Sequence, residues 1–358
     1  MHAVSRSGAV TTAVVKAPAT GSPERPTTGA PQTEATRFRR SGTVLFSVVI
    51  PTYNRLPILR RCLAALEAQD LSTAPEVEGY EVVVVDDGST DKTVAVLHRA
   101  AYPHLHLLQQ DHGGAAMARN RGVKAARGNV IVFIDSDLVV VKGFLAAHAR
   151  ALQRHWRRHG NRLCFTYGAV INTSNFAQPT TEPCKLTDLS WAYFATGNVA
   201  IDRQLLLRSG LFDTRFRQYG WEDLELGERL RQLDVVLVRC PEAIGYHWHP
   251  PFRVRQVQQL VQREQERARM AWVFYRKHPT LRVRMIIQFT WLHLLLWQAL
   301  TLGGLLNAHT MGPLLAVLVR RGRPGWALEL LRLHLNRVYV QAVFAEAQHQ
   351  RRQTPQPS

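Results

Sequence analysis

The feature that most constrains the fold is a regular alternation of apolar, strand-like runs with helix-like segments in the first half of the chain. The strand-like runs are rich in Val and Ile, and the helix-like segments carry their apolar residues on one stripe. A run that is apolar at every position predicts a strand buried on both faces, as in a parallel sheet. The pattern therefore predicts an α/β fold with a mostly parallel sheet flanked by helices. The predicted strands are 43–51, 80–88, 104–110 and 129–140, and the predicted helices are 56–69, 89–100 and 113–128.

The run "NVIVFIDSDLVV", residues 129–140, places two carboxylates one residue apart inside an apolar stretch. Burying a carboxylate is costly unless it is paired or bound to a metal, so Asp135 and Asp137 require a partner. A second acidic pair, Asp86 and Asp87, ends an earlier predicted strand. Because the carboxyl ends of parallel strands meet at one edge of a sheet, both pairs are expected at one crevice. Each acid alone could cap a helix, but a Mg²⁺ or Mn²⁺ site explains the two pairs together.

Four motifs follow one another in an informative order. They are "SVVIPTYNR" (47–55), "VVVVDDGSTD" (82–91), "ARNRGVKAARGNVIVFIDSD" (118–137) and "GWEDLELGERL" (220–230). Over residues of about 45–250 this order closely resembles the family 2 glycosyltransferases. The resemblance implies a GT-A fold with a Rossmann-like sheet over residues 44–252. It also implies a hexosyltransferase-type enzyme that uses a nucleotide-sugar donor, as in polysaccharide biosynthesis.

The resemblance further implies which residues bind the donor. The first two motifs would hold the nucleotide base, usually uracil, because a carboxylate can accept its imide hydrogen. Arg119 and Asn120 would lie near the nucleotide or the sugar. Asp135 and the adjacent Ser136 would contact the ribose or the sugar, and Asp137 would bind Mn²⁺ or Mg²⁺. The residues implied for the base are Pro51, Thr52, Tyr53, Asp86 and Asp87.

The fourth motif and a later "HWH" complete the implied site. In inverting family members an acid of the fourth motif is the general base, which here would be Asp223, while Glu222 would hold the acceptor or the donor sugar. Two acids in a first helical turn can also simply complement the helix dipole. His247 and His249 share one face if they lie in a strand, and either could be an extra metal ligand. They could equally be two polar-face histidines, and the sequence does not choose between them.

The segment between the third and fourth motifs contains a long polar loop, 172–196, with aromatic residues near its end. Trp191 and Tyr193 could stack on an acceptor sugar, or they could anchor the loop in the core. The Gln-x-x-Arg-Trp motif of processive family members is missing from the sequence, where "ERLRQL" follows the acidic pair. The sequence therefore predicts transfer of one sugar per binding event to a saccharide or lipid-linked acceptor.

The rest of the chain is basic and has no such resemblance. The net charge of +18 predicts anionic partners, and residues 253–345 read as a basic helical region. Within it, the apolar stretch 285–306 could span a bilayer, lie on its surface or pack as a core helix. We expect either peripheral attachment to the cytoplasmic membrane face or packing on the catalytic domain. Residues 1–43 and 346–358 are predicted to be disordered tails.

Other functional classes explain the sequence less well. Nucleic-acid binding is not expected, because no basic module with interleaved aromatics is present. A dinucleotide oxidoreductase would need a glycine-rich turn after the first strand, and "IPTYNRLP" has no glycine. A catalytically inactive scaffold on the same fold, or a protein that only binds anionic surfaces, remains as the alternative. Four cysteines without a CxxC pair and the lack of a signal peptide fit the cytoplasm.

Overall fold

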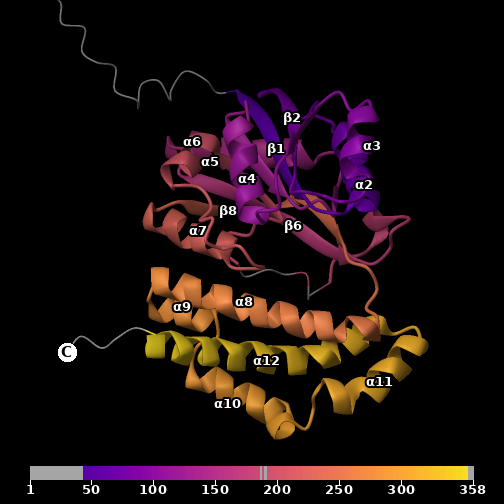
Figure 1. Cartoon of the computed structure of the whole chain (residues 1–358). Helices are drawn as coiled ribbons and strands as arrows, with labels where there is room; N and C mark the ends of the chain where they lie inside the picture. Colours follow the sequence, from indigo (N-terminus) through magenta and orange to yellow (C-terminus); the bar gives the residue numbers. More distant parts are fainter. Residues whose placement is uncertain (1–42, 186–187, 189–191, 354–358) are drawn as a thin grey trace, which may run out of the picture. The chain divides into compact units, whose positions relative to one another are not determined.

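The computed structural model describes residues 43–353, except 186–187 and 189–191. Its described part contains an eight-stranded sheet in the order β3-β2-β1-β4-β7-β6-β8-β5 (Figure 1). The strands are β1 (Val44–Thr52), β2 (Val77–Asp86), β3 (Leu105–Gln109), β4 (Val130–Ile134), β5 (Leu138–Val140), β6 (Cys164–Thr173), β7 (Asn198–Asp202) and β8 (Val236–Trp248).

Strand direction divides the sheet into two parts. Strands β3, β2, β1 and β4 are parallel to one another. Beyond β4, β7 runs antiparallel to both β4 and β6, β8 is parallel to β6, and β5 is antiparallel to β8. The α/β fold with flanking helices is confirmed. Among the described strands four pairings are parallel and three are antiparallel, so the sheet is mixed with a parallel majority. The apolar pattern could not predict this, because a strand that is buried on both faces reads the same in either direction.

The predicted single strand 129–140 is in fact two strands joined by a turn. β4 ends at Ile134, and β5 begins at Leu138. The two aspartates therefore occupy the turn rather than the strand interior. Because β5 pairs with β8 so that Leu138 lies opposite His247, the turn lies beside the end of β8.

Helices cover both faces of the sheet. Along β1, Val48 and Ile50 face one apolar cluster while Val49 faces the other, as the two-residue period of a strand requires. The first cluster contains apolar residues of α2, α3 and α5, and the second those of α4, α6 and α7. These helices are α2 (Leu56–Glu67), α3 (Thr93–Arg99), α4 (Ala115–Ala125), α5 (Phe144–His159), α6 (Arg203–Arg208) and α7 (Glu222–Gln232).

The remaining helices form a layered C-terminal region. α12 packs against α8, α10 and α11, and lies between α8 and α10 (Figure 1). Trp221 and Phe216, which precede α7, share an apolar cluster with Phe274 of α8 and Tyr339 of α12. The helices are α8 (Val257–Lys277), α9 (Leu281–Ile286), α10 (Trp291–Leu300), α11 (Ala308–Arg320) and α12 (Pro324–Gln353), with short 3₁₀ turns η1 (Pro179–Thr181), η3 (Val254–Gln256) and η4 (Leu302–Gly304).

The structure extends the helical region and decides against one of the alternatives for its apolar stretch. The helical part continues to Gln353, beyond the predicted end at residue 345. The apolar stretch 285–306 is divided among the end of α9, α10 and η4, with turns on either side of α10. Among the described residues, no helix combines the length and apolarity needed to cross a bilayer.

Candidate active site

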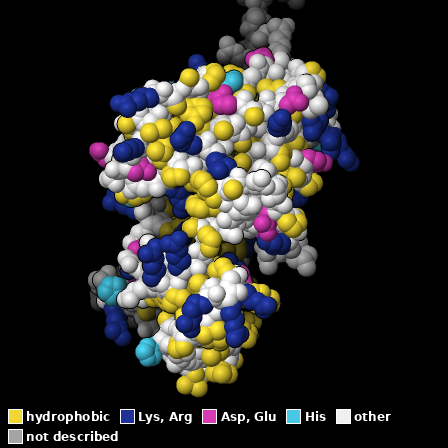
Figure 2. Space-filling model, turned by 90° about the vertical axis from the view of Figure 1, so that its right-hand side faces the viewer, with side chains coloured by type: hydrophobic (Ala, Val, Ile, Leu, Met, Phe, Trp, Pro, Cys, Tyr) yellow, Lys and Arg dark blue, Asp and Glu magenta, His cyan; other side chains and the backbone are white. Residues whose placement is uncertain are grey.

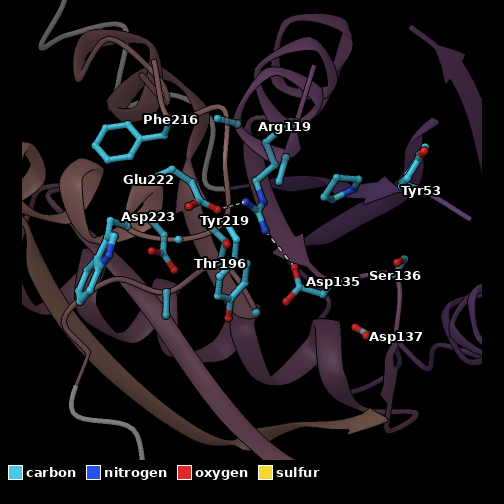
Figure 3. A pocket seen from close by; sticks show the side chains of 18 of the residues that line it. Tyr53, Arg119, Asp135, Ser136, Asp137, Thr196, Phe216, Tyr219, Glu222 and Asp223 are labelled. Atoms are coloured by element: carbon cyan, nitrogen blue, oxygen red, sulfur yellow. Dashed lines mark hydrogen bonds and ion pairs between the residues drawn. The ribbon is translucent and has the colours of Figure 1, made fainter. Parts of the chain in front are cut away.

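One pocket collects residues from the ends of β1 and β4, the start of α7 and the end of β8. The sequence separates these segments by up to about two hundred positions, so the fold alone brings them together. Figure 3 shows a close view of this pocket. Its lining includes the predicted site residues Pro51, Thr52, Tyr53, Asp87, Arg119, Asp135, Ser136, Asp137, Glu222, Asp223, His247 and His249.

Two residues that were predicted near the donor lie elsewhere. Asp86 lines a neighbouring hollow, where its carboxylate accepts a hydrogen bond from the Ser89 N–H at 3.0 Å. Asp86 is the last residue of β2, and adjacent strand residues point to opposite faces, so Asp86 and Asp87 cannot both face the pocket. The Asn120 side chain bonds the backbone N–H and carbonyl of Phe212, at 2.9 and 2.8 Å, which is a structural role.

The side of the pocket near β1 carries an aromatic platform beside a fixed carboxylate. The Tyr53 ring is stacked on His112, with ring centroids 4.4 Å apart. The Asp87 carboxylate accepts hydrogen bonds from the backbone N–H groups of Gly113 and Gly114, each at 2.9 Å. An ionised carboxylate offers about four acceptor positions, and the other two are taken by Gln110 Nε2 at 2.7 Å and by the ring nitrogen of the exposed His112 at 3.0 Å. A planar ring with an N–H donor would bind Asp87 beside Tyr53 by displacing the His112 ring.

Two aspartates of the turn between β4 and β5 form a cluster with a histidine of β8. Asp135, Asp137 and His247 each offer one ligand atom, and these atoms lie within 4.8 Å of one another. Asp137 Oδ1 is 2.9 Å from His247 Nε2, and Asp137 also pairs with Arg55. Burial alone would raise the pKa of Asp137, but the hydrogen bond from His247, together with the charges of His247, Arg55 and His249, lowers that pKa. Two carboxylates and one imidazole are suitable ligands for Mn²⁺.

The structure distinguishes the two histidines of the "HWH" segment. His247 belongs to the cluster, whereas the ring of His249 is turned to Asn172, with its Nε2 3.1 Å from the Asn172 Oδ1. The ring centroids of the two histidines are only 4.1 Å apart. The geometry therefore favours His247 as the metal-ligand candidate and leaves His249 on the pocket wall.

Arg119 of α4 connects the turn that follows β4 with the start of α7. Its guanidinium donates to Asp135 Oδ1 and to Glu222 Oε1, both at 3.0 Å, as the dashed lines in Figure 3 mark. The side chain is buried, so the two ion pairs compensate a charge that would otherwise be costly. Arg119 thereby fixes the start of α7 relative to the turn that carries Asp135 and Asp137.

Asp223 lies in the first turn of α7, next to Glu222. Its carboxylate accepts a hydrogen bond from the Leu224 N–H at 2.8 Å. Burial raises the pKa of Asp223 to about 7, and the negative charge of Glu222 adds to this rise while Arg119 opposes it. A carboxyl group with a pKa near neutrality can exchange protons at physiological pH. Asp223 therefore has the properties of a general base, in addition to any stabilisation of the helix.

Known proteins share this architecture. The chain matches the family model described as "Glycosyl transferase family 2" over residues 47–204. The matched segment carries the first three of the four motifs, and the match agrees with the family that these motifs predicted. Glu222, Asp223 and His247 lie beyond residue 204, so their roles rest on the geometry of the pocket.

Two relatives and one solved structure give the extent of the similarity. The uncharacterized glycosyltransferase YfnE of Bacillus subtilis (strain 168) is 25% identical over 268 residues, which cover 60% of this chain and 67% of that protein. Validoxylamine A glucosyltransferase of Streptomyces hygroscopicus subsp. limoneus is 34% identical over 236 residues, 56% of this chain and 51% of that protein. The chain thus spans only about half of this second relative.

The solved structure is the mannosyltransferase PcManGT from Pyrobaculum calidifontis, in complex with GDP-Man and Mn²⁺. It aligns with a TM-score of 0.51 at 21% identity, over 87% of this chain and 88% of that one. The alignment covers most of both chains, and the fold of the glycosyltransferase domain is of the GT-A type.

Nothing in the sequence indicated that α8 forms part of the pocket. Five residues of α8 line the pocket opposite residues 44–252: Gln259, Gln262, Arg263, Glu266 and Arg267. The Arg263 guanidinium lies over the ring of Tyr219, 3.7 Å from its centroid. The basic character of 253–284 was visible in the sequence, but the face that it presents depends on the packing of α8 against α7 and α12.

Two roles were predicted for the aromatic residues of the long loop, and the structure distinguishes between these roles for Tyr193. Tyr193 donates a hydrogen bond to the Val235 carbonyl, and its ring packs edge-on against Phe165 at 5.1 Å. Tyr193 therefore anchors the loop in the core, as one of its two predicted roles required. Trp191 lies outside the described residues.

Proposed function

We propose that the chain is a metal-dependent, inverting glycosyltransferase that moves one sugar from a nucleotide-sugar donor to a saccharide or lipid-linked acceptor. One observation carries the proposal. A carboxyl group with a pKa of about 7, Asp223, lines the same pocket as the Asp135–Asp137–His247 cluster. Neither the Asp223 carboxyl group nor the cluster indicates sugar transfer alone, because inverting transfer needs both a base and a site that binds the leaving group. The cytoplasm is the proposed location, since the described cysteines are free thiols.

The donor binds, in this proposal, along the strand ends. The nucleotide base stacks beside Tyr53 and donates its imide hydrogen to Asp87. The sugar lies near Arg119 and Asp135, with Ser136 between the two aspartates. A UDP-sugar is our first choice of donor. A GDP-sugar is the competitor, because PcManGT is in complex with GDP-Man.

Asp137, His247 and Asp135 would hold a Mn²⁺ or Mg²⁺ ion, since carboxylate oxygens are the ligands that these ions prefer. When bound, the metal would neutralise negative charge that develops on the diphosphate leaving group. The imidazole favours Mn²⁺ over Mg²⁺. Arg55 already pairs with Asp137 and is long enough to turn toward a diphosphate instead.

On the acceptor side, Asp223 removes the proton of the acceptor hydroxyl while that oxygen attacks the anomeric carbon. The bond from the anomeric carbon to the diphosphate breaks on the opposite side, so the configuration inverts. The negative charge of Glu222 raises the pKa of Asp223 and makes it a stronger base. Arg119 holds Glu222 in place through the ion pair at 3.0 Å.

The test is cleavage of a panel of UDP-, GDP- and dTDP-sugars by the purified chain, with Mn²⁺, with Mg²⁺ and with chelator. We expect one donor to be hydrolysed slowly without acceptor, metal to be required, and Asp137→Ala and Asp223→Asn to be inactive. Asp70→Asn is the matched control, because the exposed Asp70 side chain lies outside the pocket and accepts a local hydrogen bond from the Ser72 N–H. If no donor is cleaved and UDP does not bind in the presence of Mn²⁺, the proposal is wrong and the inactive scaffold is the better description.

A further inference from the structure

An exposed apolar surface covers the outer side of the C-terminal helices. We call it the α10–η4 patch and define it as Trp291, Leu292, Leu295, Leu296, Leu302 and Leu305. Four of these side chains are about two-thirds exposed: Trp291 68%, Leu292 68%, Leu295 66% and Leu305 69%. Figure 2 shows hydrophobic side chains gathered at the lower end of the helical region. Isolated exposed leucines are common, but a contiguous group of this kind indicates a binding surface.

α10 is apolar on both of its sides. Leu294 and Trp297 pack into the cluster that α10 shares with α8 and α12. The patch residues of α10 are spaced at i, i+1, i+4 and i+5, which places them together on the other side of the helix. The Trp291 ring touches Phe344 of α12, with ring centroids 5.3 Å apart, whereas Leu292, Leu295 and Leu296 belong to none of the apolar clusters of the described residues. A helix that is apolar all round normally has a partner on both faces.

The charges around the patch indicate what that partner is. Residues 281–353 contain nine arginines and only two acids, Glu329 and Glu346. Three of the arginines, Arg320, Arg321 and Arg323, are exposed where α11 ends. Figure 2 shows Lys and Arg side chains on both sides of the lower apolar area. A second copy of the chain would bring these like charges together, whereas an anionic lipid surface would neutralise them.

We propose that the α10–η4 patch docks on the surface of an anionic phospholipid membrane. The patch side chains enter the boundary between head groups and acyl chains, and the flanking arginines contact lipid phosphates. Because no described helix is long and apolar enough to cross a bilayer, this contact is peripheral. The inference goes beyond the proposed sugar transfer and does not depend on it.

The experiment is flotation of the full chain with two kinds of vesicle, one of phosphatidylcholine and phosphatidylglycerol in equal parts and one of phosphatidylcholine alone. We expect flotation with the anionic vesicles at low salt and much less with the neutral ones. Leu292→Ser with Leu295→Ser should lower the partition coefficient about tenfold or more, because two apolar side chains no longer leave water.

The control is Leu207→Ser with Leu233→Ser, a matched pair of exposed leucines on the glycosyltransferase domain, which should float like the wild type. Circular dichroism checks that both variants fold, and donor cleavage should be unchanged in both. Failure of the wild type to float, or equal flotation of the two variants, overturns the proposal. So does a lipid-free dimer, seen by light scattering, that the patch variant converts to a monomer while vesicles bind neither form.

Discussion

The pKa of Asp223 makes the pH dependence of sugar transfer a direct test of its role. A general base must be ionised, so the rate should follow a group with a pKa of about 7. At pH 5, two units lower, about one carboxyl in a hundred is ionised, and kcat/KM should be about 1% of its plateau. A solvent-exposed aspartate with an ordinary pKa would still be about nine-tenths ionised there. At pH 5 the two cases therefore differ about a hundredfold in relative kcat/KM, which is easily measured.

Two variants separate the causes of this raised pKa. Asp223→Asn should lose about 10²–10⁴-fold in kcat/KM at the plateau, and with it the acid limb of the profile. Glu222→Gln removes the neighbouring negative charge, so the limb should move to lower pH. The limb should still lie above the ordinary aspartate value, because burial is the larger cause.

The assay is initial-rate transfer from pH 5 to pH 9 at saturating Mn²⁺, since His247 of the candidate metal cluster also titrates. Asp70→Asn is the control and should keep the wild-type profile. A wild-type acid limb centred below about pH 5, or a limb that survives in Asp223→Asn, would refute the reasoning.

The raised pKa of Asp223 also affects the stability of the folded state. The folded pKa of Asp223 is raised, so protonation of this carboxyl favours the folded state, and that stabilisation is lost as the pH rises through about 7. Asp223→Asn should therefore raise Tm relative to the wild type at pH 8, and less so at pH 5.

Three further outcomes follow from the structure. Asp137→Asn should weaken Mn²⁺ binding at least about tenfold by calorimetry, with Asp70→Asn unchanged. Gly168→Ala should lower the free energy of unfolding by about 1–3 kcal/mol in urea titrations, because the added Cβ would lie 2.3 Å from a backbone oxygen. The control is Gly312→Ala, which should not lower this free energy, because the added Cβ would lie in open space on a helix. Glu225→Gln should lose about 3–5 kcal/mol, because this buried carboxylate, whose pKa is lowered, pairs with Arg229 and Lys277 and contacts the His278 ring nitrogen.

Local patterns predicted the part of the site that depends on strand ends. The strand before Asp135 and the acids that follow it are readable because burial and hydrophobic runs are properties of contiguous residues. The turn between β4 and β5 was not predicted, since it depends on the pairing of Leu138 with His247, more than a hundred residues away. The same pairing distinguishes His247 from His249, which a two-residue period could only place together.

The pocket wall formed by α8 could not be predicted for a similar reason. Arg263 and Glu266 occupy an amphipathic helix whose direction and rotation are set by contacts with α7 and α12. Trp221, for example, donates a hydrogen bond from its indole to the Arg267 carbonyl at 2.9 Å. Helical periodicity predicts that such a helix has an apolar face, but it does not predict which distant element that face meets.

The position of α8 has a consequence for how proteins of this type diversify. The pocket residues at the ends of β1 and β4 come from the segment that matches the family model, whereas Gln259, Gln262 and Arg263 come from a helix outside it. Substitutions on that face of α8 can change the shape and charge of one wall while leaving the strand-end residues intact. Exchange of the C-terminal region between relatives would then exchange this wall of the pocket, and a chain cut after residue 252 would lose the wall entirely.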